Sequence, residues 1–221
     1  MPVFYGVKMN LRDRLICEID TGIRTVFAKA RAGRPQPLPD ASSRAAIAAA
    51  PTEAAIKESI RLMRVNHCGE VCAQALYQGQ ALVAKEDQTR KLLLSAAKEE
   101  HDHLAWCEGR LAALGGRKSQ LSPLFYAGAF SMGIVSGFLG DKWSMGFLVE
   151  TERQVEAHLH DHLGRISPDD AGSRAILEAM REDEIRHGQA GVELGANTLP
   201  TPAKAAMSLF STVMTRSTYW I

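Results

Sequence analysis

Two short segments of the chain each contain a carboxylate and an imidazole three positions apart. These pairs are Glu100 with His103 and Glu184 with His187. In an α-helix, residues three positions apart project from one face, so each pair can bind one metal ion from one side. A single Glu-x-x-His pair also arises by chance on solvated surface helices, and its meaning therefore depends on the residues that accompany it.

Each pair is preceded by another glutamate at a regular distance. Glu70 precedes Glu100 by 30 residues, and Glu152 precedes Glu184 by 32 residues. At a rise of about 1.5 Å per residue, ~30 residues suffice to run along one helix, turn and return beside it. Four-helix di-metal carboxylate sites are built in this way, with one Glu from each of two helices and a Glu-x-x-His from each of the other two.

The order of these residues is repeated along the chain. The single Glu and the Glu-x-x-His of the first half recur 82 to 84 residues later, which is the spacing expected of a bundle with approximate twofold symmetry. We therefore predict that six residues hold a pair of metal ions and, through these ions, carry the catalysis. The predicted ligands are Glu70, Glu100, His103, Glu152, Glu184 and His187. Carboxylates combined with two imidazoles favour iron or manganese.

Composition favours a single helical domain over residues 1–221. A chain of 221 residues can bury one substantial core, and its aromatic content of only 6% favours helices over sheets. The formal net charge of +1 gives no reason to expect nucleic-acid binding. Cys68 and Cys72 form no C-x-x-C pair and are expected to be small core residues in a reducing compartment. Charged residues near the N-terminus argue against a signal peptide or a mitochondrial presequence.

The elements that must position the six ligands follow from helical periodicity and helix-ending residues. An amphipathic helix is expected over 8–31, a proline-containing linker over 35–51, the ligand-bearing bundle over 52–195 and a further helix over 200–221. Within the bundle, the ligand helices are predicted to run from about Thr52 to Lys85, from Asp87 to Gly115, from Asp141 to Gly164 and from Ser167 to Gly195.

The segment 121–149 is an unusually apolar insertion in the bundle. Its uncharged part spans at most 18 residues, fewer than the roughly 20 that a membrane-spanning helix prefers. We therefore interpret it as an interfacial or reentrant hydrophobic face, with a buried connection or a subunit interface as the alternatives. Ala129, Gly133 and Gly137 recur every four residues, which would permit close helix packing.

The two ends of the chain also have apolar faces. The basic amphipathic segment 8–31 fits an anionic membrane surface or a face of the bundle about equally well. The terminal Tyr219 and Trp220 fit a membrane interface or a docked core helix.

Several polar residues lie near the predicted ligands in sequence. His67 and Tyr77 can share the helix face of Glu70, either as outer-shell or substrate-contacting groups or as buried groups bonded to the backbone. Asp183 is a candidate to accept a hydrogen bond from a metal-binding His of another helix. Glu99 lies about 100° away from the ligand face and is expected to be solvated. No ligand role is assigned to His158, His160 or His162.

Four sequence motifs resemble those of a known family. The segment 64–70 reads R-V-N-H-C-G-E, residues 151–156 read T-E-R-Q-V-E and residues 183–187 read D-E-I-R-H, with Glu100 and His103 between them. Together they resemble the ubiquinone-biosynthesis di-iron hydroxylases that act on demethoxyubiquinol. The resemblance covers roughly residues 8–221, and the short N-terminus is similar to that of the bacterial members.

The resemblance implies an all-α, ferritin-like four-helix bundle with additional amphipathic and hydrophobic helices. It also implies an enzyme that uses O2 and two iron ions per chain to hydroxylate the ring of a polyprenyl demethoxyubiquinol, late in ubiquinone biosynthesis. Glu100 and Glu184 would bridge the irons, with Glu70 and His103 completing one side and Glu152 and His187 the other. Which imidazole serves which ion is left open.

The resemblance further implies peripheral association with the cytoplasmic side of the cell inner membrane. It leaves room for a lipid-binding accessory protein and for a homo-oligomer. No G-x-G-x-x-G motif is present, so electrons are expected from a separate reductase, from NADH bound transiently or from the quinol itself.

Two other classes of protein share part of this pattern. A ferritin-like iron-storage or peroxide-scavenging protein would use the same six ligands but would not need the apolar segment 121–149. A non-catalytic lipid-binding scaffold would keep that segment, but four convergent carboxylates would only destabilise it without cations.

Overall fold

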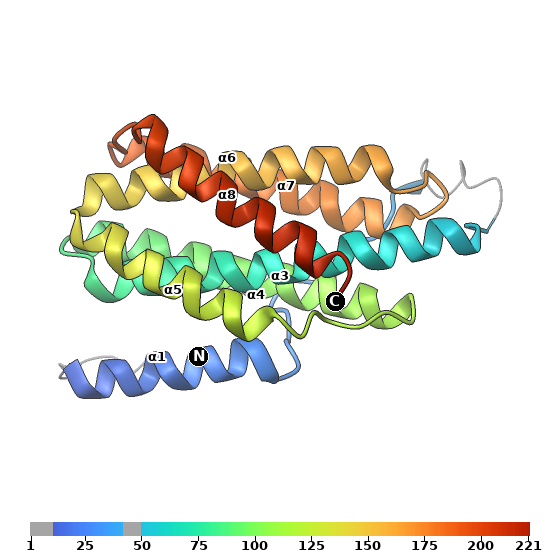
Figure 1. Cartoon of the computed structure of the whole chain (residues 1–221), viewed down its shortest axis with the longest axis horizontal. Coiled ribbons are helices and arrows are strands. Elements are labelled where there is room, and N and C mark those ends of the chain that lie inside the picture. Colours follow the sequence, from blue (N-terminus) through green and yellow to red (C-terminus); the bar gives the residue numbers. More distant parts are fainter. Residues whose placement is uncertain (1–10, 42–49) are drawn as a thin grey trace.

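The computed structural model describes residues 11–41 and 50–221, and all regular structure within these ranges is helical. The helices are α1 (Leu11–Phe27), α3 (Glu53–Val83), α4 (Asp87–Ala113), α5 (Ser122–Phe138), α6 (Asp141–Arg165), α7 (Ala171–Glu193) and α8 (Thr201–Thr218). The four long helices α3, α4, α6 and α7 form a bundle, and the other three pack on its outside (Figure 1). The predicted all-α, ferritin-like fold class is confirmed.

The ligand helices begin and end close to the predicted residues because their end signals are local. Thr52 caps α3 by accepting a hydrogen bond from the Ala55 N–H, and Asp170 caps α7 by accepting one from the Ser173 N–H. Gly115 and Gly195 follow α4 and α7 with φ of 74° and 78°, a conformation that glycine adopts readily.

The N-terminal helix is shorter than predicted. It ends at Phe27 instead of residue 31, and residues 8–10 lie outside the described residues. The chain leaves the helix there because its next backbone groups bond to α4: the Ala30 N–H donates to Glu108 and the Gly33 N–H donates to Asp102. Of the predicted linker 35–51, residues 35–40 are non-helical and residues 42–49 lie outside the described residues.

Two apolar clusters fill the bundle on either side of a polar layer. One cluster contains residues near the start of α3 and the end of α4, including Leu62, Trp106, Leu159 and Ile176. The other lies toward the opposite ends of these helices and includes Leu76, Leu93, Met145 and Leu148. The predicted ligands occupy the helical turns between the two clusters, so the bundle shields them from bulk water along its length.

The apolar segment 121–149 consists of two elements instead of one insertion. Its first part is α5, and its second part is the beginning of α6, separated by Gly140 with φ of 110°. The predicted close packing is confirmed, since a Cβ atom at Gly133 would overlap the Leu76 carbonyl oxygen of α3, and one at Gly79 would overlap the Phe130 carbonyl oxygen of α5. One face of α5 is therefore pressed directly on the α3 backbone.

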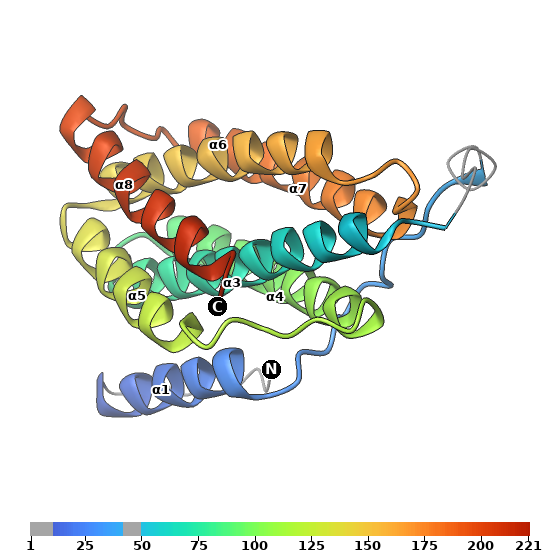
Figure 2. The ribbon, with the colours of Figure 1, turned by 45° about the vertical axis from the view of Figure 1, so that its right-hand side comes forward.

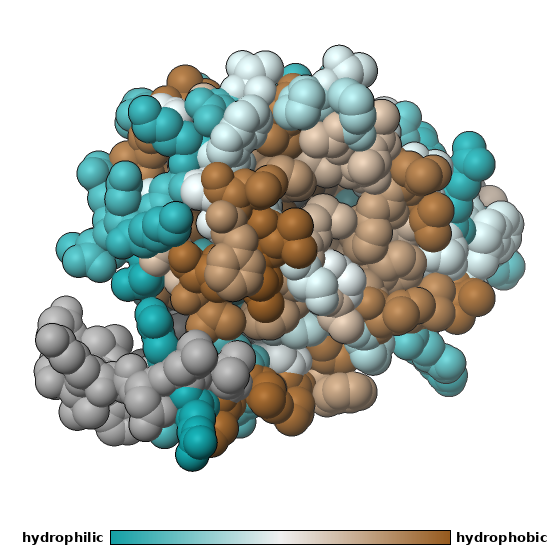
Figure 3. Space-filling model, turned by 60° about the vertical axis from the view of Figure 1, so that its left-hand side comes forward, coloured by the Kyte–Doolittle hydropathy of each residue, from teal (hydrophilic) through white to brown (hydrophobic). Residues whose placement is uncertain are grey.

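The other face of α5 remains exposed, as does much of α1. Figure 2 shows α1 beside α5 and α8 lying obliquely across the bundle. Exposed apolar side chains on α1, α5 and α8 or directly after them include Ile19, Ile23, Phe138, Leu139, Leu209 and Trp220. Hydrophobic side chains gather on one end of the molecule (Figure 3). No helix among the described residues is long and apolar enough to cross a membrane.

Candidate metal centre

All six predicted ligands lie together in the polar layer of the bundle. They form two groups in which the donor atoms lie within 4.8 Å of one another. Glu70, Glu100, His103 and Glu184 make up one group, and Glu100, Glu152, Glu184 and His187 make up the other. Glu100 and Glu184 belong to both groups, which is the position required of a carboxylate that bridges two ions.

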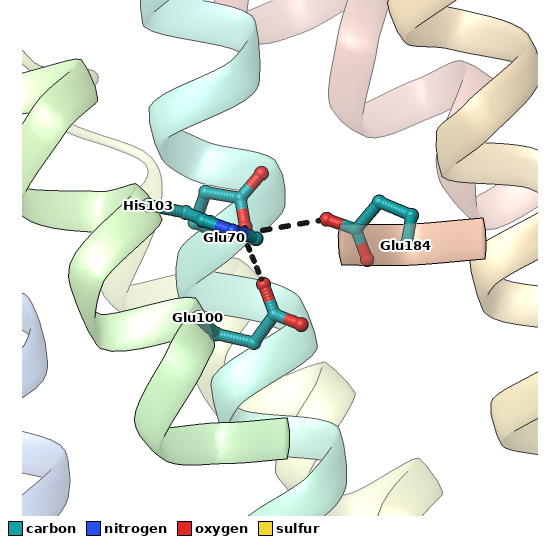
Figure 4. Close-up of side chains that lie close together, drawn as sticks. All are labelled: Glu70, Glu100, His103 and Glu184. Atoms are coloured by element: carbon teal, nitrogen blue, oxygen red, sulfur yellow. Dashed lines mark hydrogen bonds and ion pairs between the residues drawn. The ribbon is translucent and has the colours of Figure 1, made fainter. Parts of the chain in front are cut away.

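The first group surrounds one nitrogen of His103. Its Nδ1 lies 3.0 Å from Glu100, 3.4 Å from Glu184 and 3.5 Å from Glu70. In Figure 4 the side chains from α3, α4 and α7 converge on this point. An ion with ligands about 2 Å away requires donor atoms roughly 3–4 Å apart, so a small cation fits between these groups.

The second group surrounds the corresponding nitrogen of His187. Its Nδ1 lies 3.3 Å from Glu100, 3.4 Å from Glu152 and 3.6 Å from Glu184. The two halves of the chain thus supply equivalent donors on either side of the shared pair of carboxylates. This geometry reproduces the repeat that the sequence contains.

Buried atoms without partners support the fit of a cation. One carboxylate oxygen of each of the four glutamates is buried and makes no hydrogen bond within the described residues, and the same holds for Nδ1 of His187. A buried polar atom without a partner is unfavourable by about 1–3 kcal/mol, and more when it is charged. The orphaned oxygens of Glu70, Glu100 and Glu184 and the His187 nitrogen lie within 3.5 Å of another cluster atom, so divalent cations bound there would satisfy them.

The protonation of the cluster follows from its charges. Burial raises the pKa of Glu70 and of Glu152 well above the ordinary range, and nearby carboxylates raise both further. Burial alone would lower the pKa of His103, but Glu100 beside it holds that pKa well above its usual value. Without cations the cluster therefore retains protons at neutral pH. Cation binding would displace these protons.

Asp183 bonds to the imidazole of the other Glu-x-x-His helix, as predicted. Its Oδ2 lies 2.9 Å from Nε2 of His103, the nitrogen that points away from the cluster. A carboxylate in this position fixes the ring orientation and makes the opposite nitrogen a better metal ligand. The His103 interaction lowers the pKa of Asp183 even though burial opposes this.

Glu99 lies beside His187 as Asp183 lies beside His103. The prediction that Glu99 is solvated is therefore wrong. It is partly buried, it forms an ion pair with Arg186, and its carboxylate lies 3.4 Å from Nε2 of His187. Helix packing brings it there, since α7 lies against the face of α4 adjacent to the ligand face. The internal repeat could have predicted this contact, because Glu99 directly precedes Glu100 just as Asp183 directly precedes Glu184.

The two side chains that share the Glu70 face have different environments. Tyr77 is fully buried, and its hydroxyl donates a 2.6 Å hydrogen bond to Glu152, so it contacts the cluster from the opposite half. His67 is buried and makes no side-chain hydrogen bond within the described residues, and burial lowers its pKa to about 3. His67 is thus a neutral core residue.

The three histidines of α6, which are His158, His160 and His162, belong to neither of the two candidate metal-binding groups found among the described residues. Nδ1 of His162 lies 2.8 Å from the side-chain oxygen of Asn66. The rings of His158 and His162 stack with their centroids 6.5 Å apart. Burial lowers the pKa of His162 to about 4, so this imidazole is neutral at physiological pH.

An apolar cavity adjoins the cluster between α3, α5, α6 and α8. It contains about 790 Å³ of empty space including its open mouth, and its wall includes Glu70, Met132, Gln154 and Phe210. A shallower groove between α6 and α7 has Glu152 and Glu184 in its wall. The cluster can therefore be approached from two sides, and the side that reaches Glu70 is largely apolar.

Comparisons with known proteins agree with this geometry. Residues 57–218 match the family model described as ubiquinone biosynthesis protein COQ7. The chain is 55% identical over 208 residues to a 3-demethoxyubiquinol 3-hydroxylase of Chromobacterium violaceum, covering 94% of this chain and 98% of the relative. It is 54% identical over 211 residues to a protein of the same name from Dechloromonas aromatica, again covering 94% and 98%.

Proposed function

The chain belongs to the family of ubiquinone biosynthesis protein COQ7, and from this membership we propose that it is a 3-demethoxyubiquinol 3-hydroxylase. It takes a polyprenyl demethoxyubiquinol and O2 as substrates and adds a hydroxyl group to the quinol ring. The observation that carries the proposal is a buried cluster of four carboxylates and two imidazoles that adjoins an apolar cavity, with Glu70 in the cavity wall.

We propose that the cluster holds two iron ions through Glu70, Glu100, His103, Glu152, Glu184 and His187. Bound there, an iron pair would supply the reductive activation of O2, with one oxygen atom entering the ring and the other leaving as water after uptake of two electrons and two protons. The donor set supports iron, because mixed carboxylate and imidazole ligands suit it.

The protein's own residues would position the ring. The apolar wall between α5 and α8 excludes water from the ring, and Glu70 lies where the cavity meets the cluster. Polar groups such as Gln154 in the same wall can orient the ring oxygens. The polyprenyl tail would leave through the open mouth of the cavity.

The tail requires contact with a membrane, and we propose peripheral association with the cytoplasmic side of the inner membrane. Exposed apolar side chains on α1, α5 and α8 support this, because water-exposed groups of this size gain free energy in the lipid interface. The same face is available to a lipid-binding accessory protein or to a second copy of the chain. We further propose that residues 1–221 act as one domain.

Iron storage or peroxide scavenging is the alternative function for a bundle with these ligands. The relatives in the comparisons are named hydroxylases, and a storage site has no use for an apolar cavity at its ligands. Both observations favour the hydroxylase.

The test is metal analysis of the purified protein, followed by anaerobic reduction and a pulse of O2 with a short-tailed demethoxyubiquinol. We expect about two irons per chain and a hydroxylated ring. In Glu184→Ala, turnover should be lost, whereas Glu178→Ala, on the exposed side of the same helix, should retain it. Consumption of O2 without a hydroxylated product would favour the storage function. Absence of bound iron would contradict the ligand assignment.

A further inference from the structure

Part of the chain before the family match contacts residues that adjoin the metal centre. The match begins at residue 57, yet residues 28–36 run along α4 and bond to it. The Ala30 N–H donates to Glu108 over 3.1 Å, and the Gly33 N–H donates to Asp102 over 2.6 Å. We call residues 28–36 the N-terminal strap.

Arg34 is the residue of the strap that reaches the support of the cluster. Its Nε donates a 2.9 Å hydrogen bond to Oδ2 of Asp102, and its Nη2 lies 2.7 Å from Oδ2 of Asp183. The guanidinium carbon lies 4.8 Å from the centroid of the Trp106 ring, and the Trp106 indole N–H donates to the Arg34 carbonyl. Main chain and side chain of Arg34 are both held in place.

The two carboxylates that Arg34 joins come from different helices. Asp102 precedes His103 on α4, Asp183 precedes Glu184 on α7, and only 8% of each carboxylate side chain is exposed. Two nearly buried like charges repel unless a cation lies between them. The planar guanidinium can contact both at once, which a lysine ammonium on a flexible stem does less well.

The same oxygen of Asp183 that faces Arg34 also faces the imidazole. Oδ2 lies 2.9 Å from Nε2 of His103, and on the other side of that ring Nδ1 points into the cluster. A continuous series of contacts therefore leads from the Arg34 guanidinium through the Asp183 carboxylate and the His103 imidazole to Glu100. The polar atoms at each of these contacts lie no more than 3.0 Å apart.

We propose that Arg34 is a positioning residue for the metal centre, which holds Asp183 against His103 and so keeps the imidazole aimed at the ion. The N-terminal strap is thereby a functional part of the active site. The proposal rests on the proposed role of His103 as a ligand.

The support is asymmetric between the two halves of the centre. The equivalent carboxylate for His187 is Glu99, which pairs with Arg186 of α7. The same Arg186 nitrogen also lies 2.7 Å from Oδ1 of Asp183, whereas Arg34 contacts Oδ2, the oxygen that faces His103. Arg34 contacts Asp183 and Asp102, and no contact between Arg34 and Glu99 occurs among the ion pairs of the described residues. Loss of Arg34 should therefore weaken the binding of one ion and leave the other nearly unchanged.

The test is an anaerobic titration of the metal-free full chain with cobalt(II), followed by visible absorption, in wild type and in Arg34→Ala. Outer-shell partners of metal-binding histidines typically contribute about 10–100-fold in affinity. We expect one of two binding steps to weaken about tenfold and its absorption band to change, while the other step is retained. Arg34→Lys should be intermediate.

The matched control is Arg165→Ala. Like Arg34, Arg165 contacts two carboxylates, Glu58 and Asp161, and its side chain is 42% exposed against 38% for Arg34, but these carboxylates lie outside the cluster. Thermal unfolding of all metal-free variants measures the purely structural effect of losing an ion pair. The control should bind both ions with wild-type affinity.

The outcomes separate this proposal from the proposed function. Two-step binding in wild type and equal affinities in Arg34→Ala would overturn the role of Arg34, whatever its effect on thermal stability. Equal weakening of both steps would also overturn it, because that indicates general loosening of the bundle. If wild type bound no cobalt, the metal centre itself would be contradicted. If Arg34→Ala failed to fold, Arg34→Lys would test the proposal in its place. The proposal would then require that Arg34→Lys weaken one cobalt-binding step and retain the other.

Discussion

At the scale of single residues, the centre is a group of charges that cannot all be satisfied without cations. Glu100 and Glu184 are ionised beside the two imidazoles, which lower the pKa of both carboxyls against the effect of burial. Glu70 and Glu152 instead have raised pKa values. Protons and metal ions therefore compete for the same buried atoms.

This competition predicts a pH dependence of stability for the metal-free protein. The pKa values of His103 and His187 are raised in the folded state above the ordinary value of 6.5. The folded state thus binds protons that the unfolded chain releases above about pH 6.5, so the stabilisation is present below that pH and is lost as pH rises. Between about pH 7 and 8, the free energy of unfolding should fall by up to about 1.4 kcal/mol per imidazole.

Urea denaturation of the metal-free and metal-loaded protein at both pH values measures this effect. The loaded protein should show little of the decline, because bound cations have already displaced the protons from its ligating atoms. The variant His187→Gln should show a smaller slope than wild type in the metal-free form. A metal-free protein that gained stability between these pH values would contradict the charge assignment.

At the scale of elements, the close contact between α3 and α5 sets the wall of the substrate cavity. Leu76 of α3 and Met132 of α5 both line that cavity, and the glycines at the crossing allow the two helices to approach at the level of their backbones. Any side chain at the crossing would move α5 outward and change the wall.

The variant Gly133→Ala should therefore lower the free energy of unfolding by about 1–3 kcal/mol, which is typical of overpacking. The cause is the overlap between the new methyl group and the Leu76 carbonyl. Chemical denaturation measures the change. Gly164→Ala is the control, since a Cβ atom at Gly164 in α6 has no neighbour within 4 Å and alanine favours a helix over glycine. Equal stability of the two variants would show that the helices do not meet this closely.

At the scale of the whole molecule, exposed apolar side chains are distributed over helices outside the four-helix bundle. Phe138 at the end of α5 is 69% exposed and Val135 is 61% exposed. Groups of this size gain about 1.5–3 kcal/mol each when fully removed from water. A membrane surface would provide this gain and bring the cavity to its lipid substrate.

The double variant Val135→Ser and Phe138→Ser should accordingly bind vesicles of anionic phospholipid at least about tenfold more weakly than wild type. Co-sedimentation with the vesicles measures the bound fraction. Val192→Ser, which removes a 61% exposed side chain from the bundle helix α7, should bind as wild type does. Equal loss in the two proteins would place the membrane contact elsewhere.

The six cluster residues and the bounds of the four ligand helices could be predicted from the amino-acid sequence. The physical reason is that these features are local: Glu100 and His103 share a face through helix geometry alone, and residues such as Thr52 and Gly115 mark helix ends through their own backbone preferences. The contact of Asp183 with His103 was also predicted, because the repeat places the two Glu-x-x-His segments at one level.

Contacts between helices were decided only by the tertiary structure. Glu99 reaches His187 because α4 packs on α7, and Arg34 reaches Asp183 because the N-terminal strap returns along α4. The partner of the small-residue face of α5 was likewise decided by packing, since Gly133 lies directly against the α3 backbone. Spacing along the chain determines which residues share a face of one helix, whereas the packing of the helices determines what that face meets.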